Sequence, residues 1–590
     1  MRPMTPGTKS NRLEIPIKHY QTDVLIVGGG AAGTMAAFEC SEAGVPVIQV
    51  TKGRATSGTT TVARGGFAAA MGKDDSPELH LQDILKHGGE LIDPDLARVW
   101  VYDIIDVVHD LESWGAEFVR SADGQLDLKA FPSHSRNRAC HHYDTTGNMI
   151  TKVLSKKLRA DARIEKHSIT AIVALIKRDG RVIGAWGVDY QNAALVVYQA
   201  QQIILCTGGG SGLFYVNDNP PQVTGDGYVL GFRAGVPLIG IEMIDFQAMC
   251  CSPRELFGFA PHPTGFINAG AVFRNREGEE FLKRYFPDTA EQSTRSEVIL
   301  AMAKEIHAGR AGSTGGIFMD ATKVPMDVIQ KQIPHVYKTC LHRHIDITKT
   351  PLEVAPGSHT WLGGLKIDID GRTPVDGLFA AGETAGGIHG GNRIGGSALS
   401  ASLVYGRRAG KKAAALVKND RVDLNEAEGA IPEPERAWLS DLISRDRGPL
   451  QSQVRTACCM LAHNKLGPIR QERTLGGALT EFERIEREDM PAMRLDDKAR
   501  TSDKVRVEEL ESALSVRNLA LLGRILATAC LKRTESRGAH FRLDYPHTDD
   551  ERWRVTTRIQ LGVNDKFEFY TDPVKKPGSS RAGSELVLTK

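Results

Sequence analysis

The stretch Asp23-Val-Leu-Ile-Val-Gly-Gly-Gly-Ala-Ala-Gly33 delivers a run of apolar residues into three spaced glycines, Gly28, Gly30 and Gly33. The apolar run predicts a buried strand, and the glycines predict a tight turn before a helix over Thr34–Ala43. Such a turn places backbone N–H groups at a helix N-terminus, where they and the helix dipole bind a pyrophosphate. A second apolar run, Val45–Val50, completes the spacing of a βαβ unit. The sequence therefore predicts a bound dinucleotide.

The end of the second predicted strand departs from the usual pattern of dinucleotide-binding units. An Asp or Glu that binds the ribose hydroxyls is expected there, but the chain has Thr51 followed by Lys52. We therefore expect the Thr51 hydroxyl to contact the ribose, and we count Lys52 among the candidate cofactor contacts.

The composition is that of a globular protein with a small-molecule ligand. The chain has 590 residues, 41% of them hydrophobic and 25% charged, with a net charge of +2 and no long basic run, which argues against nucleic acid as a partner. The length predicts two or three domains. Residues 1–20 lack the apolar core of a secretion signal, and we find no uninterrupted apolar run long enough to span a bilayer. We expect a cytoplasmic protein without direct membrane insertion, peripheral at most through a partner.

The nine cysteines are scattered and form no C-x-x-C spacing. This pattern argues against a disulfide framework and against the usual haem, zinc and iron–sulfur motifs. We expect each cysteine to be a small buried residue, and any metal centre to come from another chain.

Three further segments suit a dinucleotide that carries a flat ring system. Residues 58–70 are small and glycine-rich and can pass close to a ring, which favours a flavin over a nicotinamide. Residues 202–210 form a second junction between a strand and glycines. Asp226, in Thr224-Gly-Asp-Gly227, precedes a predicted helix and either caps it or contacts the ribose or adenine.

The order of the elements predicts an α/β fold with a doubly wound parallel sheet of the Rossmann type. Residues 164–206 alternate as strands, with a hairpin turn at Arg178-Asp-Gly-Arg181, and Asp95–Phe118 has a helical pattern. Residues 242–356 lose the βαβ order and show few strong strands beyond Gly270–Arg274, which suggests an inserted capping domain. Residues after Lys418 are charged and helical, and Glu508–Arg533 shows one apolar face that we expect to pack in a core.

These patterns predict the following domain division: an extension over 1–20, a dinucleotide-binding domain in two parts over 21–241 and 357–418, a capping domain over 242–356, a helical domain over 419–545 and a tail over 546–590. The residues after Tyr570 are expected to be mobile.

Several motifs, taken together and in order, resemble the flavoprotein subunits of succinate dehydrogenase and fumarate reductase and the L-aspartate oxidases. Besides the first glycine turn, they include 60–66, Trp114-Gly115, Asp144–Gly147, Thr207–Gly210, Thr224–Gly227, His359–Gly364, Gly377–Leu399, Glu535–Arg542 and Asp544–Pro546. The resemblance implies FAD as the cofactor and covers most of the chain.

The same resemblance implies a set of cofactor contacts beyond the first turn. Asp226 and Glu383 correspond to positions that reach the adenosine and ribityl parts, while Ser397 and Leu399 lie along the ribityl chain and the ring at a helix N-terminus. The remaining candidate contacts are Thr59, Thr60, Gly65, Gly66, Thr207 and Gly208.

On the substrate side, the resemblance implies that His359 and Arg393 grip a small anion, usually a carboxylate. An Arg can bind a carboxylate through two parallel hydrogen bonds, which fixes its orientation. A substrate-binding histidine of the family is replaced here by Gln247, which we keep as the third candidate.

Two further departures from the family pattern alter the expected chemistry. The histidine that binds flavin covalently in the respiratory members aligns with Thr59, so FAD should be non-covalent. The family's proton-transferring arginine aligns with Ile267, or with Asn268 if a gap is allowed, and no arginine lies between Arg254 and Arg274. Unless Arg254, Arg274 or a water-linked group replaces it, fumarate and succinate turnover should be badly impaired, because a positioned acid contributes about 10²- to 10⁴-fold.

The leading hypothesis is thus an FAD-dependent oxidoreductase that acts on another small anionic substrate through an altered pocket. The alternatives are a true fumarate reductase or succinate dehydrogenase flavoprotein, an adenylylsulfate-reductase-type flavin subunit, and a flavin relay subunit without its own substrate. The electron partner is either a separate iron–sulfur subunit or a free carrier such as oxygen.

Overall fold

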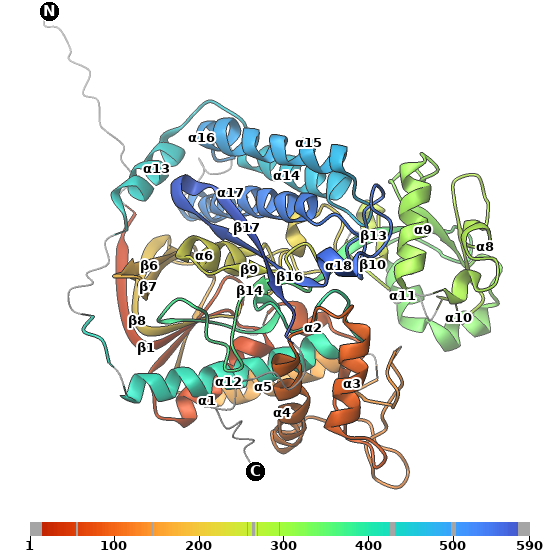
Figure 1. The fold of residues 1–590 in the computed structure, drawn as a ribbon, viewed down its shortest axis with the longest axis horizontal. Helices are drawn as coiled ribbons and strands as arrows, with labels where there is room; N and C mark the ends of the chain where they lie inside the picture. Colours follow the sequence, from red (N-terminus) through yellow and green to blue (C-terminus); the bar gives the residue numbers. More distant parts are fainter. Residues whose placement is uncertain are drawn as a thin grey trace, which may run out of the picture.

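The computed structural model describes residues 15–575, apart from 55–56, 132, 144, 257, 262–265, 268, 294, 420, 425–430 and 497–502. Its main body surrounds a seven-stranded sheet, and a smaller lobe with α8–α11 projects from one side (Figure 1). The sheet order is β5-β2-β1-β8-β7-β6, with β15 also pairing with β8. Its strands are β1 (Ile17–Val27), β2 (Val47–Thr51), β5 (Ile164–Ser168), β6 (Thr170–Arg178), β7 (Arg181–Asp189), β8 (Ala194–Leu205) and β15 (Leu378–Ala380).

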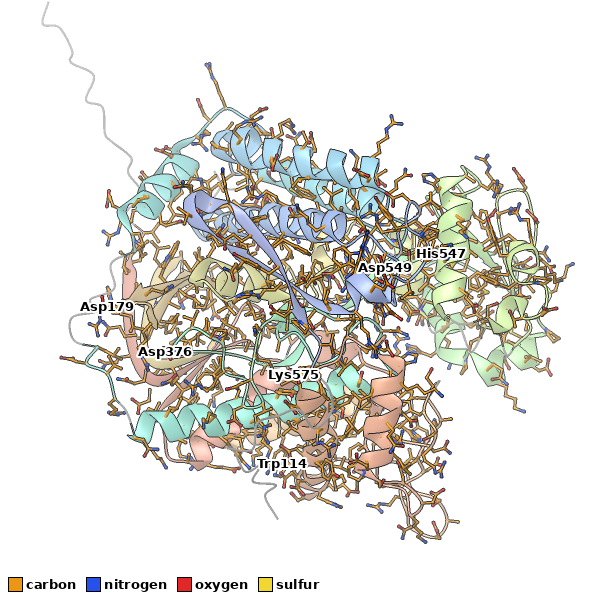
Figure 2. The ribbon with its side chains drawn as sticks, viewed as in Figure 1. Trp114, Asp179, Asp376, His547, Asp549 and Lys575 are labelled. Carbon is orange, nitrogen blue, oxygen red and sulfur yellow. The ribbon has the colours of Figure 1, made fainter. Side chains whose placement is uncertain are left out.

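The pairing in this sheet confirms the α/β fold class. β1 runs parallel to β2 and β8, and β2 runs parallel to β5, whereas β6, β7 and β8 form an antiparallel meander. Residues 24–27 of β1 are buried on both faces, which is why they form an unbroken apolar run in the sequence. The predicted hairpin turn at residues 178–181 joins β6 to β7, and its residue Asp179 is labelled in Figure 2.

The first predicted helix is α1 (Ala31–Glu42), which begins directly after the glycine turn, earlier than expected. It packs against α12 (Ser397–Asn419) at very short range. A Cβ on Gly406 would lie 2.2 Å from the Ala32 carbonyl oxygen, and one on Gly410 would lie 2.5 Å from that of Ala36. Only glycine permits this approach. The two helices therefore pack closely along faces made of glycine and alanine.

The main body contains further helices and short strands besides this sheet. The predicted helix at 95–118 is α4 (Pro94–Ser113), and its C-cap is Trp114, which is labelled in Figure 2. The other elements here are α2 (Thr59–Val62), β3 (Phe67–Ala68), α3 (Pro77–His87), β4 (Ala139–Cys140), α5 (Thr146–Ala160), η1 (Ser211–Leu213), α6 (Asp226–Ala234), β9 (Leu238–Ile239), β14 (Gly364–Leu365) and η4 (Gly382–Thr384).

The projecting lobe contains more strands than the sequence predicted. A four-stranded sheet in the order β10-β13-β12-β11 packs with α8–α11 among the described residues of the lobe, and the expectation of few strands here was wrong. All eight residues of β10 are buried, and apolar and polar residues alternate only over its first four, Ile244–Gln247, which is too short a pattern to mark the strand. The elements are β10 (Ile244–Cys251), η2 (Arg254–Leu256), β11 (Val272–Arg274), α8 (Phe281–Tyr285), η3 (Ala290–Gln292), α9 (Arg295–His307), β12 (Ile317–Asp320), α10 (Met326–Gln332), α11 (Pro334–His342) and β13 (Leu352–Trp361).

The C-terminal region is helical, as predicted, and lies against one side of the main body (Figure 1). Its longest helix, α17 (Asp503–Lys532), contacts α14, α15 and α6. Within the described residues, one helical stretch, Glu508–Lys532, is long and apolar enough to cross a membrane, but 78% of its apolar window is buried inside the protein. Packing therefore accounts for its hydropathy. The other elements are α13 (Glu433–Ser444), α14 (Gln451–Lys465), α15 (Glu472–Arg484), η5 (Ile485–Asp489) and α16 (Met490–Ala492).

Much of the predicted tail is ordered. After α18 (Asp550–Trp553), the strands β16 (Val555–Leu561) and β17 (Phe567–Pro573) form a hairpin around η7 (Val563–Asp565), and β16 pairs with β9. Lys575 lies near the start of α4 (Figure 2), and its ammonium is 2.8 Å from the Asp93 carboxylate. The expectation of a mobile tail was thus wrong as far as Lys575, and its remainder lies outside the described residues. The predicted domain boundaries stay a prediction.

Candidate functional site

One cavity of about 1070 Å³ brings together sixteen of the eighteen candidate site residues. It extends from the ends of β1 and β2, past the 58–66 segment, to the start of α12 and the capping lobe. The candidates on its wall are Gly28, Gly30, Thr51, Lys52, Thr59, Thr60, Gly65, Gly66, Thr207, Gly208, Asp226, Gln247, His359, Glu383, Arg393 and Leu399. Gly33 and Ser397 do not line it.

The glycine turn meets the cavity with the N-terminus of α1. The Gly28 N–H donates to the Val50 carbonyl at 2.8 Å, and Gly28 has φ of +125°, which disfavours any side chain. Gly33 acts through packing, since a Cβ there would lie 2.1 Å from the Gly28 carbonyl oxygen. Gly30, with φ of −76°, is the N-cap of α1 and has no side-chain cap. The turn thus leaves backbone N–H groups at a helix start, which suits a phosphate.

The 58–66 segment contacts this turn and lines the same cavity. The Ala31 N–H donates to Thr60 Oγ1 at 3.1 Å, and the Thr59 hydroxyl donates to Asn219 Oδ1 at 2.8 Å. Gly66 has φ of +92°, and a Cβ there would lie 2.6 Å from the Cys140 carbonyl oxygen. The close approach of β4 therefore holds this segment in place beside the cavity.

The end of β2 contains a charged cluster that the sequence did not predict. Lys52 Nζ lies 3.0 Å from Asp226 Oδ2 and 2.9 Å from Glu511 Oε1 of α17. Burial alone would lower the pKa of Lys52, but these two carboxylates raise it above its usual range. The Lys52 ammonium also donates to Ser515 Oγ at 2.8 Å. Glu511 and Ser515 lie more than 450 residues from Lys52, so no local signal reveals them.

Asp226 and Thr51 each make hydrogen bonds within the protein beside the cavity. Asp226 begins α6 but does not cap it; its carboxylate accepts from Lys52, from Thr224 Oγ1 at 3.1 Å and from Asn518 Nδ2 at 2.9 Å. The Thr51 hydroxyl donates to the Gly53 carbonyl at 2.8 Å. Both residues line the cavity, so the ribose hypothesis for each remains a proposal.

The second junction between a strand and glycines lies where β8 meets β15. Thr207 Oγ1 accepts the Gly227 N–H at 3.0 Å, and the Gly208 carbonyl oxygen accepts the Thr384 hydroxyl at 3.0 Å. Glu383 Oε1 accepts the Trp361 N–H at 2.8 Å. Burial nevertheless raises the pKa of Glu383 to about 7, because its surroundings disfavour the charged form.

The N-terminus of α12 closes another part of the wall. Ala398 and Leu399 line the cavity, whereas Ser397 is fully buried and its hydroxyl donates to the Ile394 carbonyl at 2.8 Å. The positive end of this helix dipole therefore faces the cavity, where it stabilises negative charge.

The candidate substrate residues lie on the wall between β13, β10 and the 387–396 loop. His359 Nδ1 and Asp218 Oδ2 are 2.8 Å apart, and an ionised carboxylate only accepts, so Nδ1 carries the proton. The Asn219 amide donates to the His359 carbonyl at 2.8 Å. The sequence did not predict the roles of Asp218 and Asn219. The His359 ring is thus oriented with Nε2 left for a ligand.

Arg393 and Gln247 complete this wall. Arg393 Nη2 is 3.2 Å from Asp245 Oδ2, and the Arg393 side chain is only 8% exposed. Gln247 Oε1 accepts the Ala248 N–H at 3.0 Å, which leaves the amide nitrogen of Gln247 as a donor. Burial lowers the pKa of the neighbouring His389 to about 3, so this imidazole is neutral. The wall therefore combines a charged guanidinium with neutral donors.

The capping lobe supplies a mainly apolar lining, to which Glu291 and Ser293 add two polar side chains. Its side chains include Ile267 and, among others, Ala260, Phe259, Phe273 and Val298. Arg274 does not line the cavity: its guanidinium lies 3.0 Å from Asp320 and 2.7 Å from Glu280. Arg274 therefore takes no part in the wall of the cavity. The side chain of Arg254 and the whole of Asn268 lie outside the described residues.

The cavity fits FAD on three observations. Its volume of about 1070 Å³ slightly exceeds the usual range for small-molecule sites, about 300–1,000 Å³, as a site for a large dinucleotide should. Two helix N-termini, those of α1 and α12, face it and suit a pyrophosphate and a ring that gains negative charge. Glycines at Gly28 and Gly66 keep the wall free of side chains where backbone segments converge. The residues present thus match the cofactor that the sequence predicted.

No metal centre is found in the described part of the chain, where no group of three or more His, Cys, Asp or Glu side chains could hold an ion. All nine cysteines are free and buried, as predicted.

Comparisons with known proteins extend over almost the whole chain. Residues 23–399 match the family model of the FAD binding domain, and residues 457–578 match that of the fumarate reductase flavoprotein C-term. The chain is 34% identical over 572 residues to a fumarate reductase (CoM/CoB) subunit of Methanothermobacter marburgensis, covering 93% of this chain and 98% of that protein. It is 30% identical over 563 residues to the L-aspartate oxidase of Streptomyces coelicolor, covering 93% of each. The solved Mycobacterium smegmatis Sdh1 complex in the apo form has 32% identity and a TM-score of 0.87, covering 95% of each chain.

Proposed function

Because the chain belongs to the family of FAD-dependent flavoprotein subunits that includes fumarate reductases and L-aspartate oxidases, we propose that it transfers hydride or electrons between FAD and a small anionic substrate. We further propose that its substrate pocket differs from the one that reduces fumarate. When bound, FAD supplies the group that accepts and donates the hydride.

The observation that carries this proposal is the placing of His359 and Arg393 on one wall of the cofactor-sized cavity. Each is held by a carboxylate, Asp218 for the histidine and Asp245 for the arginine. Side chains held in this way keep one orientation, so a ligand meets them without the cost of ordering them. A relay protein without a substrate has no need of such a wall.

In this proposal Arg393 binds a carboxylate or similar anion of the substrate through paired N–H donors. His359, oriented by Asp218 through Nδ1, presents Nε2 to the substrate, where it donates to the anion when the ring is protonated and accepts from a substrate N–H or O–H when it is neutral. The amide nitrogen of Gln247 adds a donor beside them. The apolar residues of the capping lobe exclude water, which strengthens every electrostatic contact inside.

In the described part of the pocket, no arginine stands at the position of the family's proton-transferring residue. Ile267 lines the cavity at the position of the family's proton-transferring arginine, and Arg274 is held elsewhere by Asp320 and Glu280. A positioned general acid contributes about 10²- to 10⁴-fold. We therefore expect electron transfer from the reduced protein to fumarate to be at least about a hundredfold slower than in the fumarate reductases.

The test is stopped-flow reoxidation of the dithionite-reduced protein by fumarate, beside titration of the oxidised protein with dicarboxylates. Dicarboxylates should perturb the flavin spectrum without turnover, and Arg393→Ala should abolish that perturbation. Arg552→Gln, which removes a guanidinium 81% exposed on the surface, serves as the control and should change neither result. Rapid reoxidation would contradict the altered pocket and restore true fumarate reduction as the function.

We also propose an iron–sulfur protein as the electron partner, and a cytoplasmic or peripheral location through that partner. The support is indirect: the names of two similar proteins describe one as a subunit, the other as part of a complex, and the described residues hold no metal-binding group. Co-purification with an iron–sulfur protein tests this proposal, and purification of an active single chain would contradict it.

A further inference from the structure

One cavity-lining arginine is not used by any of the contacts described so far. Arg64 lies between Ala63 and the Gly65-Gly66 pair, in the segment that joins α2 to β3. It is the one charged residue of the 58–70 segment, and its side chain is half-buried on the cavity wall. Because the neighbouring residues are small, the guanidinium is the only charged group that this segment can offer to an anion.

The backbone on both sides of Arg64 is held firmly. The Gly147 N–H donates to the Ala63 carbonyl at 2.8 Å, and a Cβ on Gly147 would lie 2.0 Å from the Thr60 carbonyl oxygen. On the other side, Gly66 is confined by the Cys140 carbonyl. Arg64 thus projects from a fixed point of the FAD-binding domain.

The side chain reaches across to the capping lobe. Its guanidinium carbon lies 5.5 Å from the centroid of the Phe259 ring, within the range of a cation–π contact. Phe259 lines the same cavity, and its own N–H and carbonyl are bonded to Leu256 and Cys251. A planar guanidinium that rests on an aromatic ring keeps its edge N–H groups available for an anion.

Arg64 differs in charge balance from the other cations of the cavity. Lys52 pairs with Asp226 and Glu511, and Arg393 pairs with Asp245. In the described ranges Arg64 forms no ion pair or hydrogen bond with any side chain. Its one cation–π contact there is with the Phe259 ring. Its charge is therefore the least compensated of the three.

We propose that Arg64 is a second cationic contact for the anionic substrate, binding it from the side of the 58–66 segment while Arg393 binds it from the 387–396 loop. This assignment rests on the proposed function, since it presumes an anionic substrate. It gives the altered pocket a guanidinium on the FAD-binding domain, in place of one on the capping lobe.

The experiment measures malonate, an unreactive dianion, binding to the FAD-loaded protein by isothermal titration calorimetry. Arg64→Gln should weaken malonate binding about tenfold or more, because a hydrogen bond to a charged group is lost. Arg64→Lys, which keeps the charge but not the paired donors, should fall between this variant and the wild type. Phe259→Leu should weaken binding about two- to fivefold by releasing the guanidinium.

The control is again Arg552→Gln, which should bind malonate as the wild type does. Unchanged malonate affinity in Arg64→Gln, with binding abolished in Arg393→Ala, would overturn the role of Arg64 and leave the proposed function intact. Reduced FAD affinity with unchanged malonate affinity would also overturn it, by making Arg64 a cofactor contact. If the wild type bound no malonate, the proposed anionic substrate and the role of Arg64 would fall together.

Discussion

Gly30→Val separates cofactor binding from folding better than any other change in the glycine turn. Gly30 has φ of −76°, which valine adopts without strain, and a Cβ there would lie 3.6 Å from Thr60 Oγ1, an ordinary contact. The apoprotein should therefore lose only about 1 kcal/mol of unfolding free energy, the usual cost of an apolar residue at an N-cap.

The same side chain would project where the pyrophosphate must approach the N-terminus of α1. If two charge-assisted hydrogen bonds to the phosphates are lost, at about 1.5–3 kcal/mol each, FAD affinity should fall about 10²- to 10⁴-fold. Gly28→Ala is the matched contrast, since its Cβ would lie 2.0 Å from the Cys206 carbonyl oxygen at a φ of +125°. That variant should lose folding stability itself, by well over 1 kcal/mol.

Two measurements on the apoproteins decide the matter: urea unfolding, and titration with FAD followed by flavin fluorescence. The reasoning requires Gly30→Val to unfold near the wild-type midpoint while FAD binding collapses. Full FAD affinity in Gly30→Val would refute the assignment of this turn to the pyrophosphate. A Gly28→Ala apoprotein as stable as the wild type would refute the packing argument.

Three further predictions concern Thr59, Glu383 and Glu511, which line the cavity or contact a residue that does. Because Thr59 cannot form a histidyl bond, acid precipitation should release all the flavin into the supernatant; fluorescence that stays with the denatured chain on a gel would contradict this. The pKa of Glu383 is about 7 in the folded protein and about 4.3 in the unfolded chain. Between these values the folded apoprotein holds a proton that the unfolded chain releases. The free energy of unfolding should therefore fall by about 3 kcal/mol from pH 5 to pH 8. Glu383→Gln should flatten that slope in urea unfolding, and an unchanged slope would show that another group causes it. Glu511→Gln should lower the unfolding free energy by about 1–3 kcal/mol through the loss of its contact with Lys52, whereas the exposed neighbour Glu508→Gln should not, and equal effects in the two variants would argue against the ion pair.

The sequence predicted the parts of the cavity that depend on local backbone geometry. The first turn and the 58–66 segment need small residues because a side chain at Gly28, Gly33 or Gly66 would meet another backbone segment, and the 207–210 junction needs them because one at Gly209 or Gly210 would meet the side chains of Glu383 and Trp361. Such demands leave glycines in the sequence, and the resemblance built on those motifs is confirmed by the matched family models.

The parts that were missed depend on contacts between distant segments. β10 is buried on both faces, so its pattern does not distinguish a strand from other buried segments. Asp218 orients His359 from 141 residues away, and nothing in its own neighbourhood marks it as a partner. Arg64 differs from Asp218, because its own neighbourhood marks it: it is the one charged residue in a glycine-rich segment.

The charged cluster at the end of β2 shows how the chain compensates for its unusual residue there. A dinucleotide unit normally has a carboxylate at this position, whereas this chain has Thr51 and Lys52, and two carboxylates approach Lys52 from elsewhere, Asp226 on α6 and Glu511 on α17. A buried ammonium without these partners would be strongly destabilising. Since Glu511 belongs to the C-terminal segment, the FAD-binding domain depends on that segment for the charge balance of its own cavity. The regions 23–399 and 457–578, although matched by separate family models, should therefore unfold as one cooperative unit.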